Sequence, residues 1–210
     1  MKSKTVSIII ISISLLLLGA CVSVVPKSTH VEPTNYLLTP VDSNLSTPHS
    51  DFLNGTSFYV RQVELPPYLE GSGLVSRTES NKVKFSNLHR WGEPLDEGIA
   101  RVVAKNLSIV LGTLNYSAYP HRKKPQCDLE IGLHLERFEK VSGAKVTLVG
   151  TWQLFRGNQQ VYTEALAEKI KLPSSATDLD ETSQVAALSQ TLRKVSEHIA
   201  AGLVRRLETE

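Results

Sequence analysis

Residues 129–136 read Leu-Glu-Ile-Gly-Leu-His-Leu-Glu, an alternation of apolar and polar side chains that predicts a β-strand with one buried and one wet face. A Ser-Gly turn at residues 142–143 leads into a second alternating stretch, residues 146–154. The chain turns again at residues 156–158 and continues as a third stretch over residues 161–172. Turn residues between such stretches are typical of hairpins. The sequence therefore predicts a three-stranded antiparallel meander.

One helix is predicted before this meander in the sequence and a second helix after it. Apolar residues recur at steps of three and four over residues 94–111 and again over residues 185–207. Asp178 and Glu181 have the spacing of a capping box at the start of the second helix. One-sided helices and one-sided strands bury their apolar faces against each other. We therefore expect a single α+β domain, in which a largely antiparallel or mixed sheet packs against two amphipathic helices.

Shorter stretches upstream predict the rest of the sheet. They are rich in β-branched and aromatic residues and are bounded by turn-forming residues. We expect strands at residues 36–38, 56–65, 74–78 and 82–85, a hairpin turn at residues 79–81, and a loop at residues 115–126. Trp91 stands just before the first helix and is placed to staple its entry to the core.

The N-terminus has the layout of a lipoprotein signal peptide. Two lysines precede an apolar run over residues 6–18, which is shorter than the about 20 apolar residues that a membrane-spanning helix needs. The run ends in Leu-Gly-Ala-Cys at residues 18–21, which resembles the bacterial lipobox, whose Cys receives a diacylglycerol thioether and an acyl chain. We predict a signal peptide over residues 1–20 and lipidation of Cys21. The alternative is an ordinary signal peptide followed by a coincidental Cys.

The segment after this cysteine reads as a linker. Residues 21–34 are interrupted by prolines and show no helical period, so we expect a lipid-anchored tether before a domain over residues 35–210. Lipoproteins with Asp after the lipid-bearing Cys tend to stay in the inner membrane, as the known sorting signals imply. Val22 is no such signal. Assuming a Gram-negative host, we therefore expect an outer-membrane, periplasm-facing lipoprotein.

The charge balance argues against a nucleic-acid-binding protein, and the cysteine content argues against a fold that is stabilised by an internal disulfide. The sequence has 23 Lys plus Arg and 21 Asp plus Glu, and residues 1–20 contain two of the lysines and no acid, so the mature chain is formally neutral. A neutral chain argues against nucleic-acid binding, which depends on phosphate neutralisation. Cys127 is the one thiol left once Cys21 carries lipid, so no internal disulfide can form. Cys127 is expected to be a buried or edge residue rather than a nucleophile.

No motif for catalysis or metal binding is present. His134 lies with Glu130 and Glu136 on the polar side of the first meander strand, but no further ligand follows at a recognisable spacing and no HExxH occurs. No Ser stands in GxSxG, and no Gly-rich loop is suited to phosphate. We predict no catalytic residue, metal or cofactor apart from the covalent lipid, and we expect alanine at His121 or His134 to be tolerated.

Residues 63–107 closely resemble a family of auxiliary lipoproteins. The matching features are Glu64 to Leu69, the Leu74-Val75-x-Arg77 strand, and the helix entry from His89 to Leu95. Asn35 to Leu38 also fit, as does the later order of strand, Gly turn, Trp152 and closing helix. In these features the chain resembles the auxiliary lipoproteins of ABC-type and MCE-type transport systems, the PqiC (YmbA) group. Gly92 is a minor departure, since Ala is usual there.

The resemblance implies a transport component without catalysis. Members of this group are outer-membrane lipoproteins that cooperate with an inner-membrane-anchored MCE-domain (PqiB-like) protein in lipid trafficking and envelope maintenance. A homo-oligomeric ring that receives the tip of the MCE shaft is implied as well. Only Cys21 transfers as a functional residue. Residues that suit a partner contact, beyond the resemblance, are Arg90, Trp91 and the basic loop residues Arg122, Lys123 and Lys124.

Two other functions fit the same sequence features. A lipoprotein that regulates a cell-wall synthase would also carry a lipobox, a tether and an α+β body. A small envelope hydrolase would require His134 or His121 to be essential. The exposed basic loop also fits a phospholipid head group or an acidic partner.

Overall fold

The structure is a computed structural model, and it describes residues 31–42, 56–121, 127–142, 144–172 and 181–208. The chain forms one compact unit over Pro33–Glu210, which is described here by itself. Cys21, the basic loop Arg122 to Lys124 and Asp178 of the expected capping box lie outside the described residues. Of the helices that the structure describes, none is long and apolar enough to cross a membrane.

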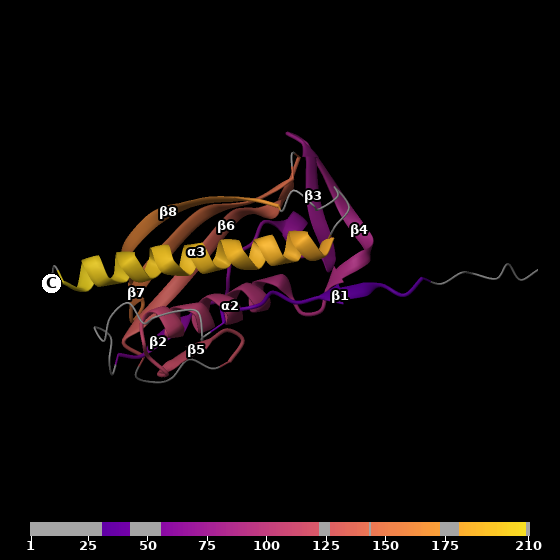
Figure 1. The fold of residues 1–210 in the computed structure, drawn as a ribbon. Helices are drawn as coiled ribbons and strands as arrows, with labels where there is room; N and C mark the ends of the chain where they lie inside the picture. Colours follow the sequence, from indigo (N-terminus) through magenta and orange to yellow (C-terminus); the bar gives the residue numbers. More distant parts are fainter. Residues whose placement is uncertain (1–30, 43–55, 122–126, 143, 173–180, 209–210) are drawn as a thin grey trace, which may run out of the picture. The chain divides into compact units, whose positions relative to one another are not determined.

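The unit combines a mixed sheet with two helices. Figure 1 shows α2 and α3 side by side along one face of the sheet, in agreement with the contacts between them and between α3 and the last two strands. In chain order, the described elements are β1 (Thr34–Tyr36), β2 (Phe58–Val60), the 3₁₀ turn η3 (Pro67–Leu69), β3 (Gly73–Glu79), β4 (Lys82–Trp91), α2 (Leu95–Val110), β5 (Tyr116–Ala118), β6 (Leu129–Val141), β7 (Lys145–Arg156), β8 (Gln159–Lys171) and α3 (Glu181–Leu207). The expected α+β fold with one mixed sheet and two amphipathic helices is confirmed.

Strand β6 is the centre of the sheet. On one side it pairs antiparallel with β7, which pairs antiparallel with β8, so the predicted meander is confirmed. Its other side is shared: the first residues of β6 pair in parallel with β2, and residues 140–141 pair in parallel with β3. Because β4 pairs with β3 and β1 with β4, the path continues as β1-β4-β3-β6-β2-β5.

Strand β6 differs from the predicted half-buried strand. His134 and Glu136 are exposed as expected, but Glu130 is 6% exposed and the strand start is buried on both faces. Arg61 Nε lies 3.9 Å from a carboxylate oxygen of Glu130, and its guanidinium stacks on the Phe155 ring at 4.1 Å. These side chains cover a face that the alternating pattern predicted to be wet.

Four other expectations on strand boundaries need correction. The first strand lies at residues 34–36 rather than 36–38, and the strand expected over 56–65 is regular only in β2. Beyond β2 the chain still follows β6, since Glu64 N–H donates to Leu133 O at 2.9 Å, but it forms no continuous ladder. Strand β4 continues past residue 85 to Trp91 because β1 pairs with its last residues. Strand β5, within an expected loop, pairs with β2.

Helix α3 packs on the meander through a close contact with a tryptophan. Trp152 of β7 is fully buried, and its indole N–H donates to Glu164 of β8 at 3.2 Å. Gly202 lies directly against the ring: a Cβ atom at this position would stand 2.6 Å from Trp152 Cζ2. The absence of a side chain at residue 202 therefore sets how closely the helix approaches the sheet.

Gly202→Ala is expected to destabilise the domain, by about 1–3 kcal/mol, because overpacking of a fixed aromatic ring outweighs the better helix propensity of Ala. Urea unfolding followed by circular dichroism measures the free energy of unfolding. Gly98→Ala is the control in α2, since the nearest atom there is Oε1 of Glu93, at the end of a partly exposed side chain that can shift together with its partner Arg101. Equal effects of the two substitutions would contradict the role of the Trp152 contact.

Candidate functional site

Of the residues expected to contact a partner, Arg90 and Trp91 differ in exposure to solvent. Arg90 is exposed, and its Nε donates to the Asn87 carbonyl oxygen at 3.0 Å. Trp91 is only 8% exposed and belongs to the hydrophobic core, which is the staple position and leaves little of its side chain for a partner.

The residues considered for catalysis or metal binding do not form a cluster. His134 Nδ1 lies 3.0 Å from a Glu64 carboxylate oxygen, and both side chains are largely exposed. His121 is exposed and follows β5 at the end of the sheet path, whereas His134 lies in the central strand β6. Among the described residues, no group of three or more His, Cys, Asp and Glu side chains is arranged to hold a metal ion. Cys127 is half-buried, and its thiol donates to the Leu129 carbonyl oxygen at 2.9 Å.

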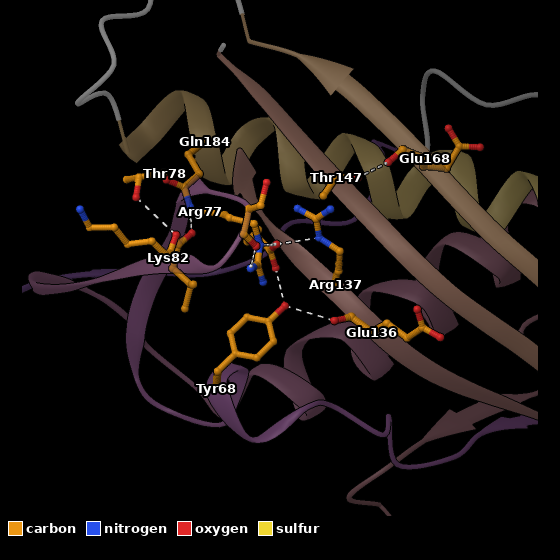
Figure 2. A network of polar contacts seen from close by, with 12 residues as sticks. Tyr68, Arg77, Thr78, Lys82, Glu136, Arg137, Thr147, Glu168 and Gln184 are labelled. Carbon is orange, nitrogen blue, oxygen red and sulfur yellow. Dashed lines mark hydrogen bonds and ion pairs between the residues drawn. The ribbon is translucent and has the colours of Figure 1, made fainter. Parts of the chain in front are cut away.

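The most developed polar site in the described unit surrounds Glu139 of β6. Its side chain is fully buried, and three donors meet on it. Arg77 Nε of β3 donates to Oε1 at 2.8 Å and Arg137 Nε donates to the same oxygen at 2.9 Å, while the Tyr68 hydroxyl donates to Oε2 at 2.6 Å. Figure 2 shows Tyr68, Arg77 and Arg137 converging between β3 and β6. We call this set of four residues the Glu139 cluster.

Local sequence explains how these side chains meet. Arg137 and Glu139 are two residues apart on one strand, so they share a face, and the register shift between Leu135 and Arg137 displaces this part of β6. Pro67 begins the η3 turn, because proline fits a first helical position, and the turn brings Tyr68 over the strand. The Arg77 guanidinium lies 5.6 Å above the Tyr68 ring.

Hydrogen bonds from the surrounding donors keep the Glu139 carboxylate ionised. Burial alone would raise the pKa of Glu139, but the hydrogen bonds from Arg77, Tyr68 and Arg137 outweigh it and hold the pKa below its ordinary value of 4.5. The hydrogen bond to Glu139 raises the pKa of Arg77. Burial and the hydrogen bond to Glu139 raise the pKa of Tyr68 to about 12. The Glu139, Arg77 and Tyr68 side chains therefore each keep one protonation state over the physiological range.

A second set of contacts joins this region to helix α3. Gln184 Nε2 donates to the Val75 carbonyl oxygen at 3.0 Å, and Ser76 Oγ lies 3.5 Å from Gln184 Oε1. A cavity of about 350 Å³ adjoins these contacts and is lined by β3, β4, β6 and α3 residues that include Lys84, Lys140 and Gln184. The hairpin of β3 and β4 is thus fixed from one side by Glu139 and from the other by Gln184.

This arrangement holds segments together and offers no reacting group. The two carboxylate oxygens of Glu139 accept three charged or phenolic donors, so the carboxylate is not available as a base. Sequence reasoning singled out the segments that contain Tyr68 and Arg77 but missed Glu139. The signal was a third acid, after Glu130 and Glu136, beyond the alternating part of the strand, and only the fold shows that Glu139 is buried.

Comparisons with known proteins agree with this description. A profile of the family described as ABC-type transport auxiliary lipoprotein component matches residues 36–200. The chain is 25% identical over 152 residues to the intermembrane transport lipoprotein PqiC of Escherichia coli K12 and to that of Shigella flexneri, which covers 72% of this chain and 76% of each relative.

Solved structures show the same fold. An uncharacterised protein of 21% identity superposes with a TM-score of 0.65 over 82% of this chain and 99% of its own. A Xanthomonas campestris protein of 14% identity superposes with a TM-score of 0.59 over 85% of this chain and 96% of its own.

These observations define a single α+β domain of the transport-auxiliary class, which is not a class of enzymes. The profile match spans most of the compact unit and includes the Glu139 cluster. The chain belongs to the family of ABC-type transport auxiliary lipoprotein components, as its resemblance to the PqiC group led us to expect.

Glu139→Gln is expected to destabilise the domain by about 2–4 kcal/mol, because it leaves two guanidinium groups facing an uncharged amide in a largely buried site. The pKa of Glu139 is lower in the folded state than its ordinary value of 4.5. The carboxylate therefore contributes to the free energy of unfolding above pH 4.5, and this contribution is lost as the pH falls below that value. Urea unfolding at pH 7 and below pH 4 measures both effects. The control is Glu136→Gln on the exposed part of the same strand. An unchanged free energy of unfolding in Glu139→Gln would contradict the assignment.

Proposed function

We propose that this chain is a lipid-anchored adaptor of an intermembrane transport system. In this proposal Cys21 fixes the protein to the outer membrane, and the domain docks a periplasm-spanning MCE-domain protein and supports envelope integrity. The observation that carries the proposal is the family match over residues 36–200, together with the Leu-Gly-Ala-Cys motif at residues 18–21. The relatives named intermembrane transport lipoprotein support the choice of system.

The described geometry suits binding and positioning. The Glu139 cluster and Gln184 fix the hairpin of β3 and β4 without exposing a group that is suited to catalysis. Arg90 on β4 and the basic loop Arg122 to Lys124 are the contacts that we propose for the partner, and Trp91 is left out because it is buried. A homo-oligomeric ring of such domains is the docking platform that we propose.

The alternative is a lipoprotein that regulates a cell-wall synthase. It shares the anchor, the tether and a binding domain, so the two proposals differ only in the partner. The relatives' names favour the transport system over the synthase.

Affinity purification of the tagged, lipidated protein from detergent-solubilised envelopes is expected to enrich an MCE-domain protein, which mass spectrometry identifies. The control is the same preparation from cells with the untagged protein. Recovery of a penicillin-binding protein without an MCE-domain protein would overturn the transport proposal and support the alternative.

Cys21→Ser is expected to release the protein from the membrane fraction and to abolish complementation of a deletion strain, because the acyl chains that hold it are no longer attached. Fractionation of envelopes and growth under envelope stress measure the two effects. Cys127→Ser is the control, since Cys127 is half-buried within the domain and a hydroxyl can replace its donor role toward Leu129. Full complementation by the unlipidated protein would contradict a function that depends on anchoring.

A further inference from the structure

The cavity next to Gln184 lies on the face of the sheet opposite the Glu139 cluster. Arg77 and Glu139 bind each other on one face. Their neighbours Ser76 and Lys140 point to the other face, because successive side chains on a strand alternate. Ser76 Oγ lies 3.5 Å from Oε1 of Gln184 in α3, so this second face is the one that α3 covers.

Three polar side chains stand in a row on this second face, and all three line the cavity. Ser76 of β3 pairs in parallel with Lys140 of β6 and antiparallel with Lys84 of β4, so the three residues lie side by side on adjacent strands. Adjacent strands are about 4.8 Å apart, which places the Cα atoms of the two lysines about 10 Å apart. The flexible lysine side chains can therefore approach one ligand from both sides of Ser76, whose small side chain leaves room between them.

The two lysines differ in their exposure to solvent. Lys140 is only 8% exposed, although its side chain ends in a charged group that needs oxygen acceptors when it is buried. An ammonium group has three hydrogen atoms to donate, so Lys140 can bind an oxygen of a ligand in addition to its contacts within the protein. Lys84 lines the same cavity but is exposed, so the cavity opens to solvent beside β4.

The remaining polar groups of the cavity leave an excess of positive charge and of donors. Among the described residues that line it, Glu181 is the only acid, and its Oε2 lies 3.8 Å from His89 Nε2. Two ammonium groups therefore face one carboxylate. Ser86 Oγ accepts a hydrogen bond from the His89 N–H at 3.0 Å, so its own hydrogen can be donated to a ligand.

We propose that this cavity binds a phosphate group, which Lys84 and Lys140 hold from two sides and to which Ser86 donates. A phosphate carries several acceptor oxygens and more charge than a carboxylate, which suits two compact ammonium charges, whereas a carboxylate is better matched by the planar fork of an arginine. The volume of about 350 Å³ is at the lower end for ligand pockets and leaves room for a glycerol unit beside the phosphate. Both a phospholipid head group and a free phosphate present this chemistry.

A phosphate in this cavity would also stabilise the position of the hairpin. Lys84 belongs to β4 and Lys140 to β6, and these two strands are otherwise connected through β3. The ligand would thus add a link between β4 and β6 to the hydrogen bond that Gln184 donates to the Val75 carbonyl oxygen. The site uses none of the residues proposed above as partner contacts, so the inference goes beyond the proposed function and does not depend on it.

Isothermal titration calorimetry on the full lipidated protein in a neutral detergent tests the site. Inorganic phosphate is titrated in one experiment and glycerophosphoglycerol, the deacylated head group of phosphatidylglycerol, in the other, both at an ionic strength held constant with sodium chloride. Tighter binding of glycerophosphoglycerol supports a phospholipid head group as the ligand, and tighter binding of inorganic phosphate supports a free phosphate. Absence of binding by both overturns the proposal.

Substitutions of single lysines locate the binding in the cavity. Lys84→Gln is expected to weaken binding of the tighter ligand by about tenfold or more, because a hydrogen bond between charged groups is lost. Lys82→Gln is the matched control, since it makes the same charge change on the same strand, but Lys82 pairs with Glu79 and does not line the cavity. It is expected to leave the affinity unchanged, because exposed charges away from the ligand are screened by salt.

Lys140→Met removes the second ammonium group while it keeps an unbranched side chain, and it is expected to abolish binding. Its thermal unfolding shows whether the domain still folds. Equal affinities of Lys84→Gln and Lys82→Gln overturn the proposal, and this comparison does not require Lys140→Met to fold. Such a result leaves the proposed function intact, since that function is tested by the recovery of an MCE-domain protein.

Discussion

The buried carboxylate of Glu139 fixes the part of the domain on which the proposed function depends. An isolated charge cannot stay buried, so Glu139 requires the guanidinium groups of Arg77 and Arg137 and the Tyr68 hydroxyl. These donors come from β3, from β6 and from the η3 turn, so satisfying one charge fixes the position of three segments. A hydrophobic contact would tolerate sliding of β3 along β6, whereas directed hydrogen bonds do not.

The parts of the fold that depend on local periodicity were predictable, and those that depend on long-range pairing were not. The meander and both helices repeat at their own periods, and Gly112 with a φ of 68° ends α2 as its residue type suggests. Strand β5 and the end of β4 exist because β2 and β1 pair with them. The residues of these two segments do not by themselves predict a strand, because the preference for a short strand depends on the strands that pair with it.

The difference between local patterns and long-range contacts also applies to the residues of the candidate site. Sequence reasoning placed Arg90 and Trp91 together as contact candidates, yet one is exposed and the other is in the core. Neighbours on a strand point to opposite faces, so at most one of the two can face a partner. Glu139 was missed because the donor of its shortest hydrogen bond, Tyr68, stands 71 residues away in the sequence. The two side chains meet only through the fold, and no local motif connects them.

The shared edge of β6 has a consequence for the order in which the domain can form. Phe58 of β2 pairs with Leu129, and Ser76 of β3 pairs with Lys140, so both upstream strands await a partner far along the chain. Long-range pairings of this kind form slowly because the intervening loop must close first. If the chain emerges N-terminus first, the β6-facing edges of β2 and β3 therefore stay unpaired until β6 arrives, although β3 can already pair with β4. In the proposed lipoprotein, Cys21 would then receive its lipid while the domain behind it is still unfolded.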